Sequence, residues 1–119
     1  MIPTMINHLA FRVSDLDKTS ALFQQLGYVE VRRTAHGVGA VEMESPQQPG
    51  LILEFTLPKR EGEKLGFDHA GFTLDGEDEL KKLVEAGFPE TSEPKLVPGS
   101  GRTTSNLNDH DGIKWQFNL

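Results

Sequence analysis

The feature that most constrains the fold is an internal repeat, because each half of the chain opens with the same short pattern around a histidine. The first copy covers residues 7–13 and the second covers residues 68–74. Their histidines, His8 and His69, stand at equivalent positions in the two copies. Each copy is followed by an acidic helix start, a helical stretch, a glycine and an aromatic residue. A repeat of this length predicts two copies of one structural unit. If the two histidines converge on one site, they provide the first two ligands of a metal centre.

Composition excludes several classes of function. A length of 119 residues fits one compact domain. The net charge is -6 without a Lys/Arg-rich run, so we expect no nucleic-acid partner, because phosphate backbones need a positive surface. The chain has no cysteine, which leaves His, Asp, Glu and Gln for any chemistry. No segment approaches the ~20 apolar residues of a membrane span and none resembles a signal peptide, so we expect a soluble cytoplasmic protein without a membrane partner.

Hydrophobic periodicity predicts the order strand, helix and three strands twice over. The first module, about 5–57, contains predicted strands at 6–13, 28–34, 38–45 and 51–57, with a helix at 15–26. A charged linker covers 58–65. The second module, about 66–119, contains predicted strands at 67–74, 91–97, 102–108 and 113–119, with a helix at 77–86. Its prolines restrict the strand at 91–97 to a sheet edge. We therefore predict two βαβββ modules in tandem within a single domain.

Strand alternation selects four polar residues that face inward, away from the apolar sides that meet the helices. They lie on the first and last strands of each module. His8 and Glu54 are 46 positions apart, and His69 and Gln116 are 47 positions apart. These near-equal spacings predict a symmetric placement of the two pairs.

Two imidazoles, one carboxylate and one amide oxygen form a donor set suited to Zn, Ni, Fe, Co or Mn. With four protein ligands, only a five- or six-coordinate ion keeps positions open for a substrate. Each histidine alone also fits a structural, hydrogen-bonded residue, and an inward Gln116 also fits a solvated polar side chain. Asp109 and Asp111 are typical of a hairpin turn rather than a calcium site.

The chain resembles the vicinal oxygen chelate superfamily, and the resemblance rests on residues 6–16, 67–72 and 108–117. This superfamily includes glyoxalase I, methylmalonyl-CoA epimerase, extradiol dioxygenases, fosfomycin-modifying transferases and metal-free bleomycin-binding proteins. The resemblance spans essentially the whole chain. It implies an α+β, glyoxalase-like fold in which two βαβββ modules form curved mixed sheets around a cavity. One scaffold hosts all of these reactions, so the resemblance is specific for the fold rather than the reaction.

The resemblance also implies metal ligands at His8, Glu54, His69 and Gln116. Glyoxalase I of the bacterial type has His, Glu, His and Glu in this order, so the chain departs from it at Gln116. A glutamine coordinates through its oxygen but accepts no proton as a general base. Glu54 is then the one candidate catalytic base. Epimerase-like members use two His, one Gln and one Glu, which is the composition found here.

The implied function is that of a metal-dependent lyase or isomerase resembling lactoylglutathione lyase. It would act on a small molecule with adjacent oxygens through a metal-stabilised enediolate. Arg12 and Arg102 are candidates for binding the substrate, although either also fits a surface charge. The resemblance implies a homodimer. The alternatives are an epimerase-like member, a metal-free antibiotic-binding module similar to bleomycin resistance proteins, and a structural homologue with a vestigial site.

Overall fold

The computed structural model describes residues 2–35, 37–88, 94–97 and 102–119. The chain divides into two compact units. We call His8–Asp68 the N-terminal unit, and His69–Leu119 together with Met1–Asn7 the C-terminal unit. The chain therefore passes from one unit to the other immediately before each of the repeated histidines.

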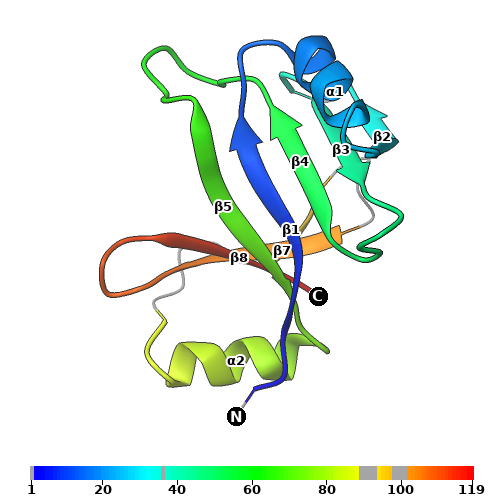
Figure 1. The fold of residues 1–119 in the computed structure, drawn as a ribbon. Helices are drawn as coiled ribbons and strands as arrows, with labels where there is room; N and C mark the ends of the chain where they lie inside the picture. The colour runs from blue at the N-terminus through cyan, green and yellow to red at the C-terminus, as the bar shows by residue number, and fades with distance from the viewer. Residues whose placement is uncertain (1, 36, 89–93, 98–101) are drawn as a thin grey trace. The chain divides into compact units, whose positions relative to one another are not determined.

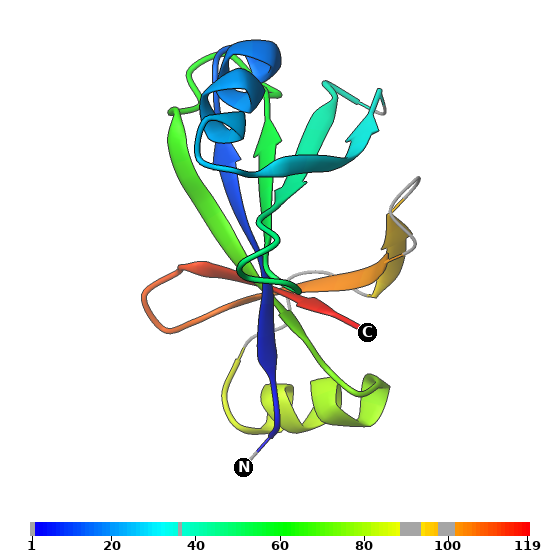
Figure 2. The same ribbon diagram turned by 45° about the vertical axis from the view of Figure 1, so that its right-hand side comes forward.

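The N-terminal unit contains a mixed four-stranded sheet and one helix (Figure 1). Its elements are β1 (Met5–Arg12), which enters the unit at His8, α1 (Leu16–Gln24), β2 (Val29–Thr34), β3 (Ala40–Glu44) and β4 (Ile52–Thr56). The strand order is β2-β3-β4-β1. β1 is parallel to β4, whereas β2, β3 and β4 pair in antiparallel fashion. α1 lies along β2, β3 and β4 (Figure 2).

The C-terminal unit repeats this arrangement. Its elements are β5 (Gly66–Thr73), which enters the unit at His69, α2 (Glu77–Glu85), β6 (Lys95–Val97), β7 (Arg102–Asn108) and β8 (Lys114–Asn118). The strand order is β5-β8-β7-β6, with β5 parallel to β8 and the other pairs antiparallel. The α+β fold with two βαβββ modules is thus confirmed. Of the strand predicted at 91–97, residues 95–97 form β6 and residues 91–93 lie outside the described part of the chain.

Local sequence signals set the helix boundaries. Asp15 is the N-cap of α1, and its side chain accepts a hydrogen bond of 2.9 Å from the backbone N–H of Lys18. α2 lacks a side-chain cap, but three acidic residues at 77–79 occupy its first turn, where the helix dipole favours negative charge. Gly27 and Gly87 follow the two helices with φ values of 87° and 118°, a conformation that glycine adopts without strain.

Each unit has its own hydrophobic core on the helix-facing side of its sheet. The buried residues of the N-terminal core are Val41, Met43, Leu53 and Phe55. Those of the C-terminal core are Leu74, Leu80, Leu83, Leu107 and Phe117. Successive side chains alternate between the faces of a strand, so the opposite face of each sheet carries the polar residues. Those two polar faces are where functional groups can be presented.

Candidate functional site

The register of β1 against β4 places His8 and Glu54 on the same polar face of the N-terminal unit. Ala10 is the cross-strand partner of Glu54, and His8 lies two residues earlier on the same side of β1. The ligand atoms of His8 and Glu54 lie within 4.8 Å of one another, and His8 is only 1% exposed. Two donors that share an ion at about 2.0–2.2 Å lie within about 4.4 Å of each other. At most a small side-chain adjustment therefore allows this pair to bind one ion.

The C-terminal unit has the same diagonal arrangement. Gly71 on β5 is the cross-strand partner of Gln116 on β8, and His69 lies two residues before Gly71. His69 and Gln116 therefore share the polar face of their sheet, and His69 is 7% exposed. Within its own unit, this pair occupies the positions that His8 and Glu54 occupy in theirs.

A second carboxylate, which sequence reasoning missed, lies beside Glu54. Glu42 on β3 is the direct cross-strand partner of Glu54. Facing residues of antiparallel strands have Cβ atoms about 4.5–5.5 Å apart. Glu42 is 5% exposed and forms an ion pair with Arg32 on β2, which compensates its buried charge. The alternation pattern of the sequence could have identified it. Glu42 stands between two apolar residues of the same strand and therefore points to the opposite, polar face.

The equivalent positions of the C-terminal unit carry amides. Asn106 on β7 is the cross-strand partner of Gln116, as Glu42 is the partner of Glu54. Asn118 extends the same polar face, and its Nδ2 donates to Asn7 Oδ1 at 3.1 Å. At these facing positions, carboxylates therefore lie in the N-terminal unit and amides in the C-terminal unit.

Arg12 also lies on the polar side of β1, and its guanidinium contacts two carboxylates of the N-terminal unit. It pairs with Asp68 at 2.6 Å and with Glu63 at 3.4 Å. Glu63 accepts backbone hydrogen bonds from Lys59 at 2.6 Å and Arg60 at 3.0 Å, and these two bonds are the main cause of its lowered pKa. Arg12 therefore ties the loop after β4 to the end of β1. A role in substrate binding stays a prediction.

The other substrate-binding candidate, Arg102, begins β7, and its side chain lies outside the part of the chain that the structure describes.

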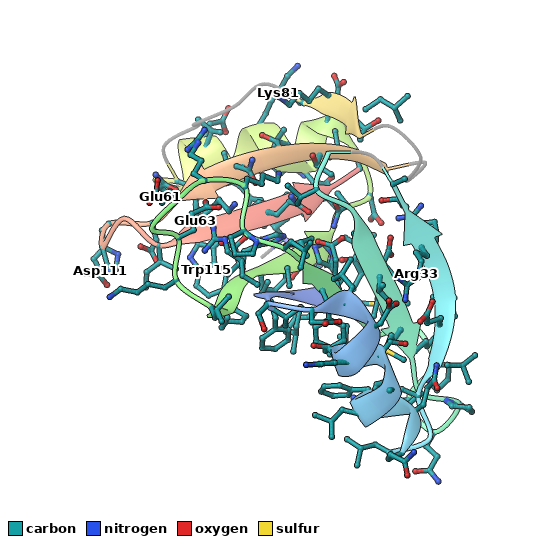
Figure 3. All side chains as sticks on the ribbon, turned by 90° about the horizontal axis from the view of Figure 1, so that it is seen from above. Arg33, Glu61, Glu63, Lys81, Asp111 and Trp115 are labelled. Atoms are coloured by element: carbon teal, nitrogen blue, oxygen red, sulfur yellow. The ribbon has the colours of Figure 1, made fainter. Side chains whose placement is uncertain are left out.

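The acidic turn at 109–111 closes the β7–β8 hairpin, and Figure 3 shows Asp111 at its tip. Asp109 Oδ2 accepts a hydrogen bond of 2.9 Å from Trp115 Nε1. Asp109 Oδ1 accepts from the backbone N–H groups of Asp111 at 2.9 Å and Ile113 at 3.0 Å. The Trp115 bond is the largest cause of the lowered pKa of Asp109, followed by the Ile113 and Asp111 bonds. Both carboxylate oxygens stabilise the turn, as the sequence predicts.

Residues 5–117 match the family model described as the Glyoxalase/Bleomycin resistance protein/Dioxygenase superfamily. The chain belongs to this superfamily. The match covers nearly all of both modules, in agreement with the resemblance found in the sequence. No curated protein matches the chain. None of the described helices is long and apolar enough to cross a membrane.

Solved structures with a similar fold include methylmalonyl-CoA epimerases. The enzyme from Mycobacterium tuberculosis has a TM-score of 0.82 at 15% identity, over 95% of this chain and 85% of that chain. An epimerase in complex with methylmalonyl-CoA and ammonium has a TM-score of 0.80 at 17% identity, covering 99% and 94% of the two chains. A hypothetical protein from Bacillus halodurans has a TM-score of 0.79 at 14% identity, covering 97% and 93%. Identities this low establish a shared fold and leave the reaction open.

Proposed function

We propose that this superfamily member is a metal-dependent lyase or isomerase that acts on a small molecule with two adjacent oxygens. The metal ligands in this proposal are His8, Glu54, His69 and Gln116. The observation that carries it is the repeated diagonal pairing of a histidine with an oxygen donor, in the same register on β1–β4 and on β5–β8. A hydrogen-bonded structural histidine does not require the same oxygen-bearing neighbour in both units, whereas a metal centre shared by the two units requires oxygen ligands at fixed positions.

The donor chemistry fits a divalent ion. Imidazole nitrogen with carboxylate and amide oxygen suits Zn, Ni, Fe, Co or Mn. Burial of His8 beside the half-buried Glu54 also fits, because a bound cation would compensate the charge of a partly desolvated carboxylate. When bound, such an ion would polarise the substrate oxygens and stabilise the negative charge of an enediolate or enolate.

The chain's own residues supply the proton transfer. Glu54 is the proposed general base, because its carboxylate oxygens accept a proton and the amide of Gln116 does not. Glu42 faces Glu54 across the β3–β4 pair and can receive or return a second proton. Arg32, paired with Glu42, keeps this neighbouring carboxylate oriented. Proton transfer is therefore assigned to the N-terminal unit, and the C-terminal unit contributes binding.

An epimerase-like reaction is the second candidate. The proposed ligand set contains two His, one Glu and one Gln, which is the composition of epimerase-like members. The presence of two carboxylates, Glu54 and Glu42, also meets the need of an epimerase for two proton carriers. Parallel assays with the hemithioacetal of methylglyoxal and glutathione and with methylmalonyl-CoA distinguish the two reactions.

The metal content of purified protein tests the proposal. Elemental analysis is made on wild type, His8→Ala, His69→Ala and the control His110→Ala, whose side chain is 90% exposed in the turn. We expect close to one divalent ion per chain in wild type and the control, and loss of the ion in both other variants. Wild type that retains no ion after incubation with all five candidate metals would refute the metal site and favour the metal-free binding module.

We further propose that the protein is a homodimer, as the resemblance implies. Size-exclusion chromatography with light scattering is expected to give twice the chain mass of 13.2 kDa. A monomer mass across the micromolar range would contradict this.

A further inference from the structure

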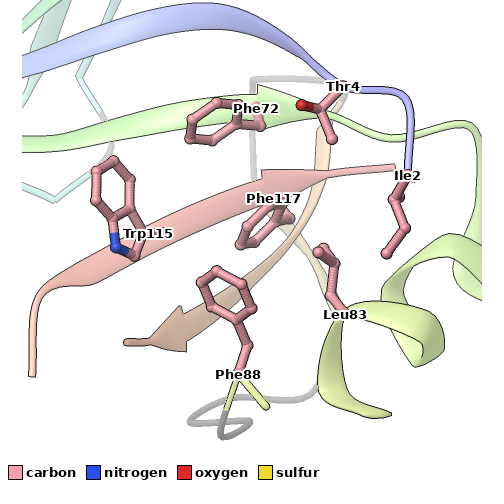
Figure 4. Close-up of a pocket in the computed structure, with 7 residues that line it drawn as sticks. All are labelled: Ile2, Thr4, Phe72, Leu83, Phe88, Trp115 and Phe117. Atoms are coloured by element: carbon pink, nitrogen blue, oxygen red, sulfur yellow. The ribbon is translucent and has the colours of Figure 1, made fainter. Parts of the chain in front are cut away.

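The C-terminal unit contains an apolar cavity of about 400 Å³ on the helix-facing side of its sheet (Figure 4). It lies among β8, α2 and the N-terminal segment. Trp115 and Phe117 line it, and they point to the opposite face of β8 from Gln116. The cavity is therefore separate from the proposed metal ligands of this unit, and the proposed function leaves it unexplained.

Comparison of the two modules explains why a cavity exists here. The side chain at one equivalent helix position is larger in the N-terminal unit than in the C-terminal unit. In the N-terminal unit, the ring of Phe23 packs against Phe55 at 5.0 Å and Tyr28 at 5.6 Å between centroids. Phe23 lies four residues before Gly27, and the residue four before Gly87 is Leu83. A leucine replaces a phenyl ring at the equivalent position.

The C-terminal unit keeps the rest of this aromatic arrangement. Phe88 packs edge-on against Phe117 at 6.0 Å, and Phe72 stacks on Phe117 at 5.6 Å with an interplanar angle of 21°. Phe72 and Trp115 lie 5.9 Å apart. The space that Phe23 fills in the first unit is thus bounded by aromatic rings in the second.

The lining sets the chemistry of a ligand. Among the residues that the structure describes, no charged side chain lines the cavity. The indole N–H of Trp115 already donates to Asp109, so it is engaged within the hairpin. Thr4, in the exposed N-terminal segment, contributes a hydroxyl to the lining. An ion would lose its hydration here without compensation, whereas an aromatic ring gains stacking and edge-to-face contacts.

We infer that the C-terminal unit binds a small, uncharged aromatic molecule in this cavity, with its ring among Phe72, Trp115 and Phe117. The volume falls within the roughly 300–1,000 Å³ typical of ligand pockets. Any polar substituent of the ligand faces the Thr4 end.

The probe N-phenyl-1-naphthylamine tests this, because it is uncharged and absorbs where tryptophan emits. Trp115 is the only tryptophan of the chain. We expect saturable, one-to-one quenching of Trp115 emission with matching sensitised emission from the probe. Leu83→Phe restores the missing ring and is expected to weaken binding at least 10-fold without lowering the melting temperature. Leu22→Phe, the same change at a 63% exposed site on α1, is the control and should bind like wild type.

A second variant, Ile2→Phe, reaches the cavity from the N-terminal segment and should also weaken binding if Leu83→Phe fails to fold. No saturable signal with folded wild type, or wild-type affinity in a folded cavity-filled variant, would overturn the inference. The result is independent of the metal proposal, since His8→Ala is expected to lose the metal and keep the probe.

Discussion

At the scale of single residues, carboxylates and amides are divided unequally between the two polar sheet faces. Glu54 and Glu42 face each other in the N-terminal unit, while Gln116 and Asn106 face each other in the C-terminal unit. An amide has nearly the shape of a carboxylate but accepts no proton at neutral pH. In the proposed mechanism, both faces present oxygen donors, and proton transfer by carboxylates is confined to the N-terminal unit.

Glu54→Gln tests this division. The change leaves an oxygen donor in place and removes the base, so we expect turnover to fall about 10²–10⁴-fold. Metal content should fall much less than in His8→Ala. Steady-state kinetics with metal analysis of the same sample measures both, and unchanged turnover would contradict the assignment of Glu54 as the base.

Gln116→Glu is the reciprocal change. It adds a negative oxygen donor to the proposed ligand set, so we expect tighter retention of the ion against a chelator. Gln116→Ala should weaken retention, and Asn106→Ala, at the facing position, serves as the matched control. Equal retention in all four proteins would show that Gln116 is not a ligand.

At the scale of elements, the β7–β8 hairpin depends on one carboxylate. Asp109 accepts hydrogen bonds from Trp115 and from two backbone N–H groups of the turn, and its pKa is lowered below the ordinary value of 3.8. A carboxyl whose folded pKa lies below its unfolded pKa stabilises the fold above the unfolded value. This stabilisation is lost as the pH falls through the folded pKa.

Asp109→Asn should therefore destabilise the protein at pH 7, with a difference from wild type that shrinks below pH 3.8. Urea titrations followed by Trp115 fluorescence at several pH values measure the difference. A difference that stays constant down to pH 2 would mean that the ionised carboxylate is not what stabilises the turn.

The Arg12–Asp68 ion pair joins the start of β5 to the end of β1. Both side chains are partly exposed, so their coupling energy should be modest, at about 0.2–1 kcal/mol. A double-mutant cycle with Arg12→Gln and Asp68→Asn measures it, and the coupling should decrease in 1 M salt. A rise in KM without loss of stability in Arg12→Gln would instead support the substrate-binding prediction.

The sequence predicted most elements because their signals are local. Period-two alternation predicted that His8 and Glu54 share one face, and Asp15 and Gly27 marked the ends of a helix. Glu42 was missed because its importance depends on the β3–β4 register, which brings it opposite Glu54. Register between separate strands is set by tertiary packing rather than by any one segment.

The aromatic cavity could not be predicted from the sequence either. Alternation predicted that Trp115 and Phe117 face the helix, but not whether the helix fills the space between them. The sequence does show that the N-terminal module has Phe23 where the C-terminal module has Leu83. Its consequence depends on the spacing between α2 and β8, which only the structure supplies.

At the scale of the whole molecule, each unit has a separate core, and the chain passes between the units immediately before His8 and His69. We propose that the two units nevertheless form a single domain, with modules at about 5–57 and 66–119 joined by the linker at 58–65. A metal that takes ligands from both units would couple their folding, because an ion that binds only the folded state stabilises it.

Thermal unfolding should therefore show one transition that shifts upward with metal. At a free-ion concentration of 100 Kd, the expected stabilisation is about 2.7 kcal/mol. Calorimetry of wild type and of His8→Ala with and without metal measures it. Two separate transitions in the metal-loaded protein would contradict a single cooperative domain.

Anomalous diffraction from a crystal grown with Zn²⁺ or Ni²⁺ tests the central claim most directly. The account predicts one strong peak per chain with His8, Glu54, His69 and Gln116 at bonding distances of about 2.0–2.2 Å. A peak bound by residues of one unit alone would contradict the four-residue site. A fully loaded crystal without a peak at these residues would refute the metal centre.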